Sequence, residues 1–77
     1  MDFNSDKVDE AVLALLYLTT FKSESGVRAW KGLDWGALER LYGKGYIGNP
    51  KSKSKSVVMT EEGARQSELL FKKHFTP

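Results

Sequence analysis

Apolar residues near the N-terminus recur with the spacing of an α-helix. The main apolar stripe is made of Val8, Ala11, Val12, Leu15, Leu16 and Thr19. A second stripe, on a flanking face, is made of Leu13, Tyr17 and Phe21. Positions three or four residues apart share one face of a helix, so both stripes predict a helix over this segment. Asp6 is its predicted N-cap, because a short polar side chain there satisfies free backbone N–H groups.

The second stripe on this helix needs a cover of its own. One alternative is a cover within the chain, in which Trp30 and Phe75 fold over the stripe. The other is a second copy of the chain, and a two-fold homodimer is the simplest closed assembly. We favour the dimer, since a contiguous exposed apolar stripe usually marks an interface. The predicted interface residues are Leu13, Tyr17, Phe21, Phe71 and Phe75.

Residues 22–33 are predicted to form a short strand between two turns. Ser23 to Gly26 is rich in turn-forming residues, and Gly32 ends the following pattern. Between them, Val27 to Trp30 alternates between two faces in the manner of a strand. We expect Trp30 to lie in the core, because tryptophan is mostly buried on average.

A second helix is predicted from Leu33 or Asp34 to Lys44, with Asp34 as its N-cap. Its predicted buried stripe consists of Trp35, Leu38, Leu41 and Tyr42. Its predicted exposed face consists of Gly36, Glu39, Arg40, Gly43 and Lys44. That face carries one arginine and no asparagine or glutamine, so it is poor in groups that read DNA bases.

A basic hairpin is predicted to follow the second helix. Tyr46 to Gly48 and Val57 to Met59 are its predicted strands, and residues 49–56 form a tip rich in lysine and serine. If the tip is extended, lysines at alternate positions lie on one side of it, roughly 6.5–7 Å apart. That distance is about two phosphate steps along one strand of duplex DNA.

A third helix is predicted after Thr60, its N-cap, with Glu61 and Glu62 in the first turn. Its predicted inward positions are Ala64, Ser67, Leu70, Phe71, His74 and Phe75. The order of elements predicts an α+β fold: one small winged-helix-like domain over residues 1–77, with three helices and a two- or three-stranded antiparallel sheet. The wing is placed at residues 46–60. Winged-helix proteins have a further helix before the recognition helix, and residues 22–33 do not predict one.

Positive charge is distributed unevenly along the chain. The net charge of +2 is too small to indicate a nucleic-acid partner by itself. Residues 40–55, however, contain no acid, and their basic residues are Arg40, Lys44, Lys51, Lys53 and Lys55. Clustering on one side is the pattern of a contact with DNA phosphates, so these residues are the predicted DNA contacts. The alternative is that the lysines only keep the hairpin soluble.

Several kinds of chemistry are disfavoured by the composition. The chain has no cysteine and a single histidine, His74, so we expect no metal site and no cofactor. It also lacks a Gly-x-x-x-x-Gly-Lys-Ser/Thr phosphate loop and any nucleophile beside a base, so we expect no enzyme activity. The longest apolar run, Ala11 to Leu18, is shorter than the ~20 residues that span a bilayer. We therefore expect a cytoplasmic protein without a membrane partner.

Two resemblances add to this interpretation. The run from Leu38 to Ile47, the basic hairpin and the run from Val58 to Gly63 together resemble the second half of MarR- and PadR-type regulators. This resemblance implies a winged-helix fold and DNA binding. The whole chain also resembles an uncharacterised family of short bacterial proteins, through Asp6 to Ala11 and Arg28 to Trp35. That second resemblance implies no function.

Two functions are therefore predicted. The first is binding of double-stranded DNA through the wing and the second helix, mainly to phosphates and with weak specificity, as would suit a transcriptional regulator. The alternative is a protein–protein interaction module that keeps the winged-helix scaffold without binding DNA. Because one fold serves both functions, the fold alone does not decide between them.

Overall fold

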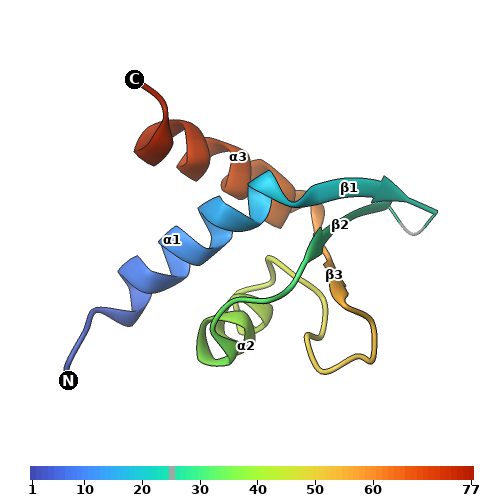
Figure 1. Cartoon of the computed structure of the whole chain (residues 1–77), viewed down its shortest axis with the longest axis horizontal. Coiled ribbons are helices and arrows are strands. Elements are labelled where there is room, and N and C mark those ends of the chain that lie inside the picture. The colour runs from blue at the N-terminus through green and yellow to red at the C-terminus, as the bar shows by residue number, and fades with distance from the viewer. Residues whose placement is uncertain (25) are drawn as a thin grey trace.

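The computed structural model describes residues 1–24 and 26–77 and has an α+β fold (Figure 1). The described residues form three helices and a three-stranded antiparallel sheet of order β1-β2-β3, a layout compatible with a winged helix. The elements are α1 (Ser5–Leu18), β1 (Thr20–Ser23), β2 (Gly26–Trp30), α2 (Trp35–Gly43), β3 (Ser56–Val58) and α3 (Glu61–Phe75). Helix α1 packs against both α3 and α2, and the β1–β2 hairpin projects beyond the helices (Figure 1).

Helix α1 begins earlier than predicted and is rotated relative to the prediction. Its N-cap is Asn4, whose side chain accepts a hydrogen bond from the backbone N–H of Lys7 at 3.1 Å, so the assignment of Asp6 was wrong. Ala11 and Leu15 of the predicted main stripe are exposed. The residues that are buried are Asp9, Val12, Leu13, Ala14 and Leu16. The buried face of α1 differs from the predicted face because α1 packs against two helices, α2 and α3, at once.

The sheet confirms the predicted strand at Val27 to Trp30 and corrects the wing. Strand β2 pairs with β1 on one side and with β3 on the other, where Ala29 lies opposite Val57. Residues 46–48 do not form a strand, and Ile47 makes only an isolated bridge with Met59. The predicted two-stranded wing is therefore largely a loop. Strand β1 was predicted partly as helix, because Phe21 continues the helical spacing of Leu13 and Tyr17, and partly as a turn, because Ser23 resembles a turn residue.

The hydrophobic core lies where α1, α2 and the sheet meet. Its residues are Val12, Leu13, Leu16, Ala29, Ala37, Leu38, Leu41, Ile47, Val57 and Met59. The predictions that Trp30, Trp35 and Tyr42 are buried were wrong, since 54%, 53% and 48% of their surfaces are exposed. In β2 the alternation of side chains turns Ala29 to the core and Trp30 to the opposite face.

Helix α3 starts as predicted, with Thr60 as the N-cap, but the predicted inward positions of His74 and Phe75 were wrong, because both residues are exposed. The Thr60 hydroxyl accepts a hydrogen bond from the Gly63 N–H at 2.9 Å, and the Thr60 N–H donates to the Tyr46 carbonyl at 3.1 Å. These bonds seat the first turn of α3 against the backbone that follows α2. A Cβ atom on Gly63 would lie 1.7 Å from the Tyr46 carbonyl oxygen, so no side chain fits there. Glycine is therefore required at residue 63 by close backbone contact.

Replacing Gly63 with alanine is expected to destabilise the protein by about 3 kcal/mol, because a clash with backbone cannot be relieved by a side-chain rotation. The matched control is Gly43→Ala at the end of α2, where an added Cβ meets nothing within 4 Å. This control should be neutral or stabilising by up to about 1 kcal/mol, since alanine favours helix. Urea denaturation followed by circular dichroism measures both. Equal stabilities of the two variants would contradict the packing of α3 on Tyr46.

Candidate nucleic-acid interface

Arg40 and Lys44, predicted to contact DNA, turn inward to a buried carboxylate on α1. The Nε–H of Arg40 lies 2.8 and 2.9 Å from the two carboxylate oxygens of Asp9. The Nζ of Lys44 donates to Asp9 at 3.0 Å and to Asp6 at 3.3 Å. Only 1% of the Asp9 surface is exposed, and a buried carboxylate needs such partners. The two cations therefore hold α1 against α2, while 34% of the Arg40 side chain and 38% of the Lys44 side chain remain exposed.

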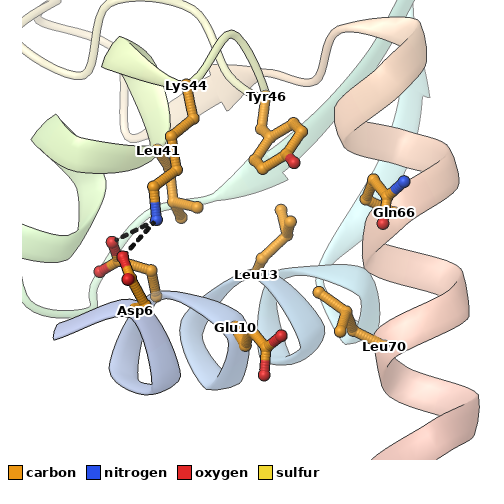
Figure 2. A pocket seen from close by; sticks show the side chains of 9 residues that line it. Asp6, Glu10, Leu13, Leu41, Lys44, Tyr46, Gln66 and Leu70 are labelled. Atoms are coloured by element: carbon orange, nitrogen blue, oxygen red, sulfur yellow. Dashed lines mark hydrogen bonds and ion pairs between the residues drawn. The ribbon is translucent and has the colours of Figure 1, made fainter. Parts of the chain in front are cut away.

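This ion-pair cluster forms one end of a pocket of about 260 Å³ between α1, α3 and the residues that follow α2. Figure 2 shows Lys44 reaching down to the carboxylates of α1, with Leu13, Leu70 and Tyr46 along the rest of the pocket. The hydrogen bond to Asp9 raises the pKa of Lys44 above its ordinary value, so Lys44 is charged at neutral pH. Because Asp6 and Glu10 also line the pocket, it is a poor site for phosphate.

Asp9 is a buried structural residue whose role the sequence interpretation missed. It was assigned only a favourable interaction with the dipole of the first helix. Its spacing held a further signal, because Asp9 precedes Val12, Leu13 and Leu16 by three, four and seven residues. An acid in register with a buried stripe is expected to lie in the core beside a cation.

The predicted lysines at the hairpin tip form a separate basic surface. We call residues 49–55 the lysine loop. Lys51, Lys53 and Lys55 are all exposed there, although the backbone bends and does not form the extended strand expected. The regular spacing predicted for these side chains therefore does not apply. Lys51 makes a loose pair with exposed Glu39 at 3.8 Å, whereas Lys53 and Lys55 pair with no described acid.

Two basic residues outside the lysine loop, Lys31 and Arg28, donate hydrogen bonds to the loop or to the residue that follows it. The Nζ of Lys31 donates to the carbonyl oxygens of Pro50 and Ser52 at 2.6 and 2.8 Å. Arg28, on β2, donates from Nε to the Ser56 hydroxyl at 2.8 Å and from Nη2 to the Ser56 carbonyl at 2.9 Å. The loop is thus anchored through its own Pro50 and Ser52 carbonyls and through Ser56, the residue of β3 that follows it. Sequence reasoning missed Lys31 and Arg28, because their partners lie about twenty to thirty residues away.

A groove of about 400 Å³ lies between the lysine loop and residues 31–38, and we call it the tryptophan groove. Trp35 lines one side, and the opposite side is formed by Ser52, Lys53 and Lys55. The Nζ of Lys31 lies 5.6 Å from the centroid of the Trp35 ring, a cation–π contact. This groove combines an aromatic surface with positive charge.

The predicted dimer stripe is covered within one chain. Leu13 is 1% exposed and belongs to the core, so its assignment as a dimer contact was wrong. The Tyr17 ring packs on Phe71 with centroids 5.3 Å apart, and Phe71 packs on Phe75 at 5.4 Å. The Phe21 ring stacks on Trp30 at 4.9 Å. Cover within the chain by Trp30 is thus as the alternative predicted, whereas Phe71, in place of Phe75, packs on Tyr17. Assembly through other residues stays a prediction.

Residues 1–24 and 26–77 contain neither a cluster of metal ligands nor a membrane-spanning helix. No group of three or more histidine, aspartate or glutamate side chains there could hold a metal ion. No helix in this part of the chain is long and apolar enough to span a bilayer. The nearest contact of the single histidine to an acid is 3.8 Å, from His74 to Glu10.

Substituting Asp9 with asparagine is expected to destabilise the protein by about 3–5 kcal/mol, because Arg40 and Lys44 lose a buried charged partner. Asp6→Asn is the matched control, since 85% of its side chain is exposed. The control should change the free energy of unfolding by less than about 1 kcal/mol. Chemical denaturation at neutral pH tests both. A similar small effect for both variants would show that Asp9 does not organise the contact between α1 and α2.

The comparisons with known proteins identify a family. Residues 4–77 match the family described as a domain of unknown function, DUF6429. The uncharacterized protein y4hR of Sinorhizobium fredii (strain NBRC 101917 / NGR234) is 50% identical over 76 residues, which cover 99% of each chain. No solved structure matches the chain significantly. The predicted resemblance to an uncharacterised bacterial family is confirmed, whereas the resemblance to MarR and PadR regulators is not shown. The chain belongs to the DUF6429 family.

Proposed function

We propose that the protein binds nucleic acid through phosphate contacts from the lysine loop, and that it acts by binding and not by catalysis. The observation that carries this proposal is the exposure of Lys51, Lys53 and Lys55 on a loop anchored from behind by Lys31 and Arg28. Lysine ammonium groups that neutralise phosphates release counterions from DNA, which favours association. We further propose that the protein acts in the cytoplasm, the location predicted from the sequence.

Anchoring of the loop supports the proposal energetically. A flexible loop must lose conformational freedom when it binds, and this loss weakens the complex. Here the bonds from Lys31 to Pro50 and Ser52 fix the backbone before any ligand arrives. Only the lysine side chains then remain to be ordered. The bonds that Arg28 makes to Ser56 fix the other end of the loop in the same way.

We expect weak sequence specificity, because the basic residues of α2 are paired with Asp9. Arg40 and Lys44 are engaged by Asp9, and the exposed face of α2 presents Trp35, Glu39 and Tyr42. None of these three is the arginine, asparagine or glutamine that commonly reads a base edge in the major groove. A role in transcription regulation, as the resemblance to MarR and PadR regulators predicts, would need specificity from another source. We therefore propose contacts with phosphates as the main source of affinity.

The triple variant Lys51→Ala, Lys53→Ala, Lys55→Ala is expected to weaken binding of generic duplex DNA at low salt. Its slope of log affinity against log salt should fall by up to roughly 2.7, since each lost phosphate contact removes about 0.9. A second triple variant, Lys7→Ala, Lys72→Ala, Lys73→Ala, removes the same charge from α1 and α3. Fluorescence anisotropy with labelled duplex over a salt series measures the slopes. Equal slopes for the two variants would contradict a phosphate contact at the lysine loop.

An exposed apolar face favours protein interaction as the second candidate function. A groove of about 380 Å³ is lined by Leu15, Leu18 and Leu33, all of which are exposed. Leu18 is 63% exposed at the end of α1. Contiguous exposed apolar side chains often mark an interaction surface. If the chain forms the predicted homodimer, we propose that this face carries the contact, because the originally predicted stripe is covered within the chain.

Sedimentation velocity at micromolar concentration tests this second candidate. Self-association through the face predicts a dimer for the natural protein and a monomer for Leu18→Glu, which places a charge in the contact. Leu69→Glu is the matched control, because Leu69 is 55% exposed on α3 and does not line the groove. The control should remain dimeric. A monomer at every concentration of the natural protein would contradict self-association.

A further inference from the structure

Trp35 lies outside the buried face of α2 and is exposed. It is the first residue of α2, and its neighbour Asp34 caps the helix by accepting a hydrogen bond from the Ala37 N–H at 3.0 Å. That cap fixes the start of the helix and therefore the backbone position from which the indole projects. The core contacts of α2 come instead from Ala37, Leu38 and Leu41. A large aromatic side chain with half its surface in water is available to a ligand.

One side chain connects the two sides of the tryptophan groove. Lys31 makes the connection, because its Nζ lies near the Trp35 ring and also donates to the Pro50 and Ser52 carbonyls. The volume of about 400 Å³ lies within the range of small-ligand sites, roughly 300–1,000 Å³. The groove is therefore built before a ligand arrives.

The charge of the groove selects among flat ligands. Lys31, Lys53 and Lys55 line it, and no acidic side chain does. An aromatic surface flanked by lysines suits a nucleobase that stacks on the ring while its phosphates contact the ammonium groups. In a duplex the bases are stacked on one another and paired, so only an unpaired base reaches Trp35. Leu33 and Leu38 supply the remaining apolar lining.

We infer that the tryptophan groove binds an unpaired nucleobase, so that single-stranded nucleic acid is preferred to duplex. This inference rests on the proposed function, because the flanking phosphates are those that the lysine loop contacts. Stacking on an aromatic side chain is worth about 1–3 kcal/mol per base, which corresponds to a roughly 5- to 150-fold difference in affinity. The base site and the phosphate site are thus separable by experiment.

The test measures affinity for three labelled probes at one salt concentration. The probes are a single-stranded oligonucleotide with bases, the same sugar–phosphate chain without bases, and a duplex of the same length. The full chain should bind the base-bearing strand roughly 5- to 150-fold more tightly than the abasic strand. Trp35→Ala should abolish this difference. Trp30→Ala should keep it, because Trp30 is equally exposed but does not line the groove.

Fluorescence keeps the inference falsifiable if Trp35→Ala does not fold. In Trp30→Phe, Trp35 is the remaining tryptophan, and a stacked base should quench its emission while the abasic strand does not. Equal affinity for the base-bearing and abasic strands, or no selective quenching, overturns the base site and leaves phosphate binding intact. Failure of all three probes to bind at low salt overturns the proposed function itself. Selective binding and quenching by the base-bearing strand supports both.

Discussion

The structure depends on one buried carboxylate. Asp9 on α1 is bound by Arg40 and Lys44, which lie four residues apart and so share one face of the chain leaving α2. A carboxylate removed from water is tolerated only with charged partners and hydrogen bonds, so the three residues constrain one another. The rotation of α2 about its axis follows from this constraint. Because Arg40 and Lys44 point to α1, the opposite face of α2 points outward. That face carries Trp35, Glu39 and Tyr42.

That rotation explains the differences between the predicted and observed faces of α2. Apolar spacing placed Trp35 and Tyr42 with Leu38 and Leu41, which is a wide stripe on a short helix. The ion pairs with Asp9 narrow the buried face to Ala37, Leu38 and Leu41 and expose the two aromatic residues. Local pattern could not reveal this, because the partners of Asp9 lie 31 and 35 residues away in the sequence. The sequence pattern shows the apolar spacing along α2. It does not show that Asp9, a distant residue, also determines which face of α2 is buried.

Sequence reasoning was most successful where the determining contacts are local. The caps of α2 and α3 depend on bonds within three residues, from Asp34 to Ala37 and from Thr60 to Gly63, and both were predicted. The strand at β2 was predicted from alternation, whereas its pairing with β3 was not, because pairing is a choice between distant strands. In the candidate site, the exposure of the three loop lysines was predicted. The anchoring cations and the tryptophan groove were not, since they arise only when β2, α2 and the loop come together.

The same type of side chain thus has two different roles in this chain, and the difference is set by its neighbours. Arg40 and Lys44 face carboxylates and stabilise the fold, while Lys53 and Lys55 have no described acidic partner. Lys31 combines features of both roles, because its Nζ donates to loop carbonyls and also lies beside the Trp35 ring. Because the basic residues of α2 are paired with a buried carboxylate, they are poorly placed to read the major groove. We therefore propose that nucleic-acid binding depends on the lysine loop and on Trp35, which the rotation of α2 places beside the loop.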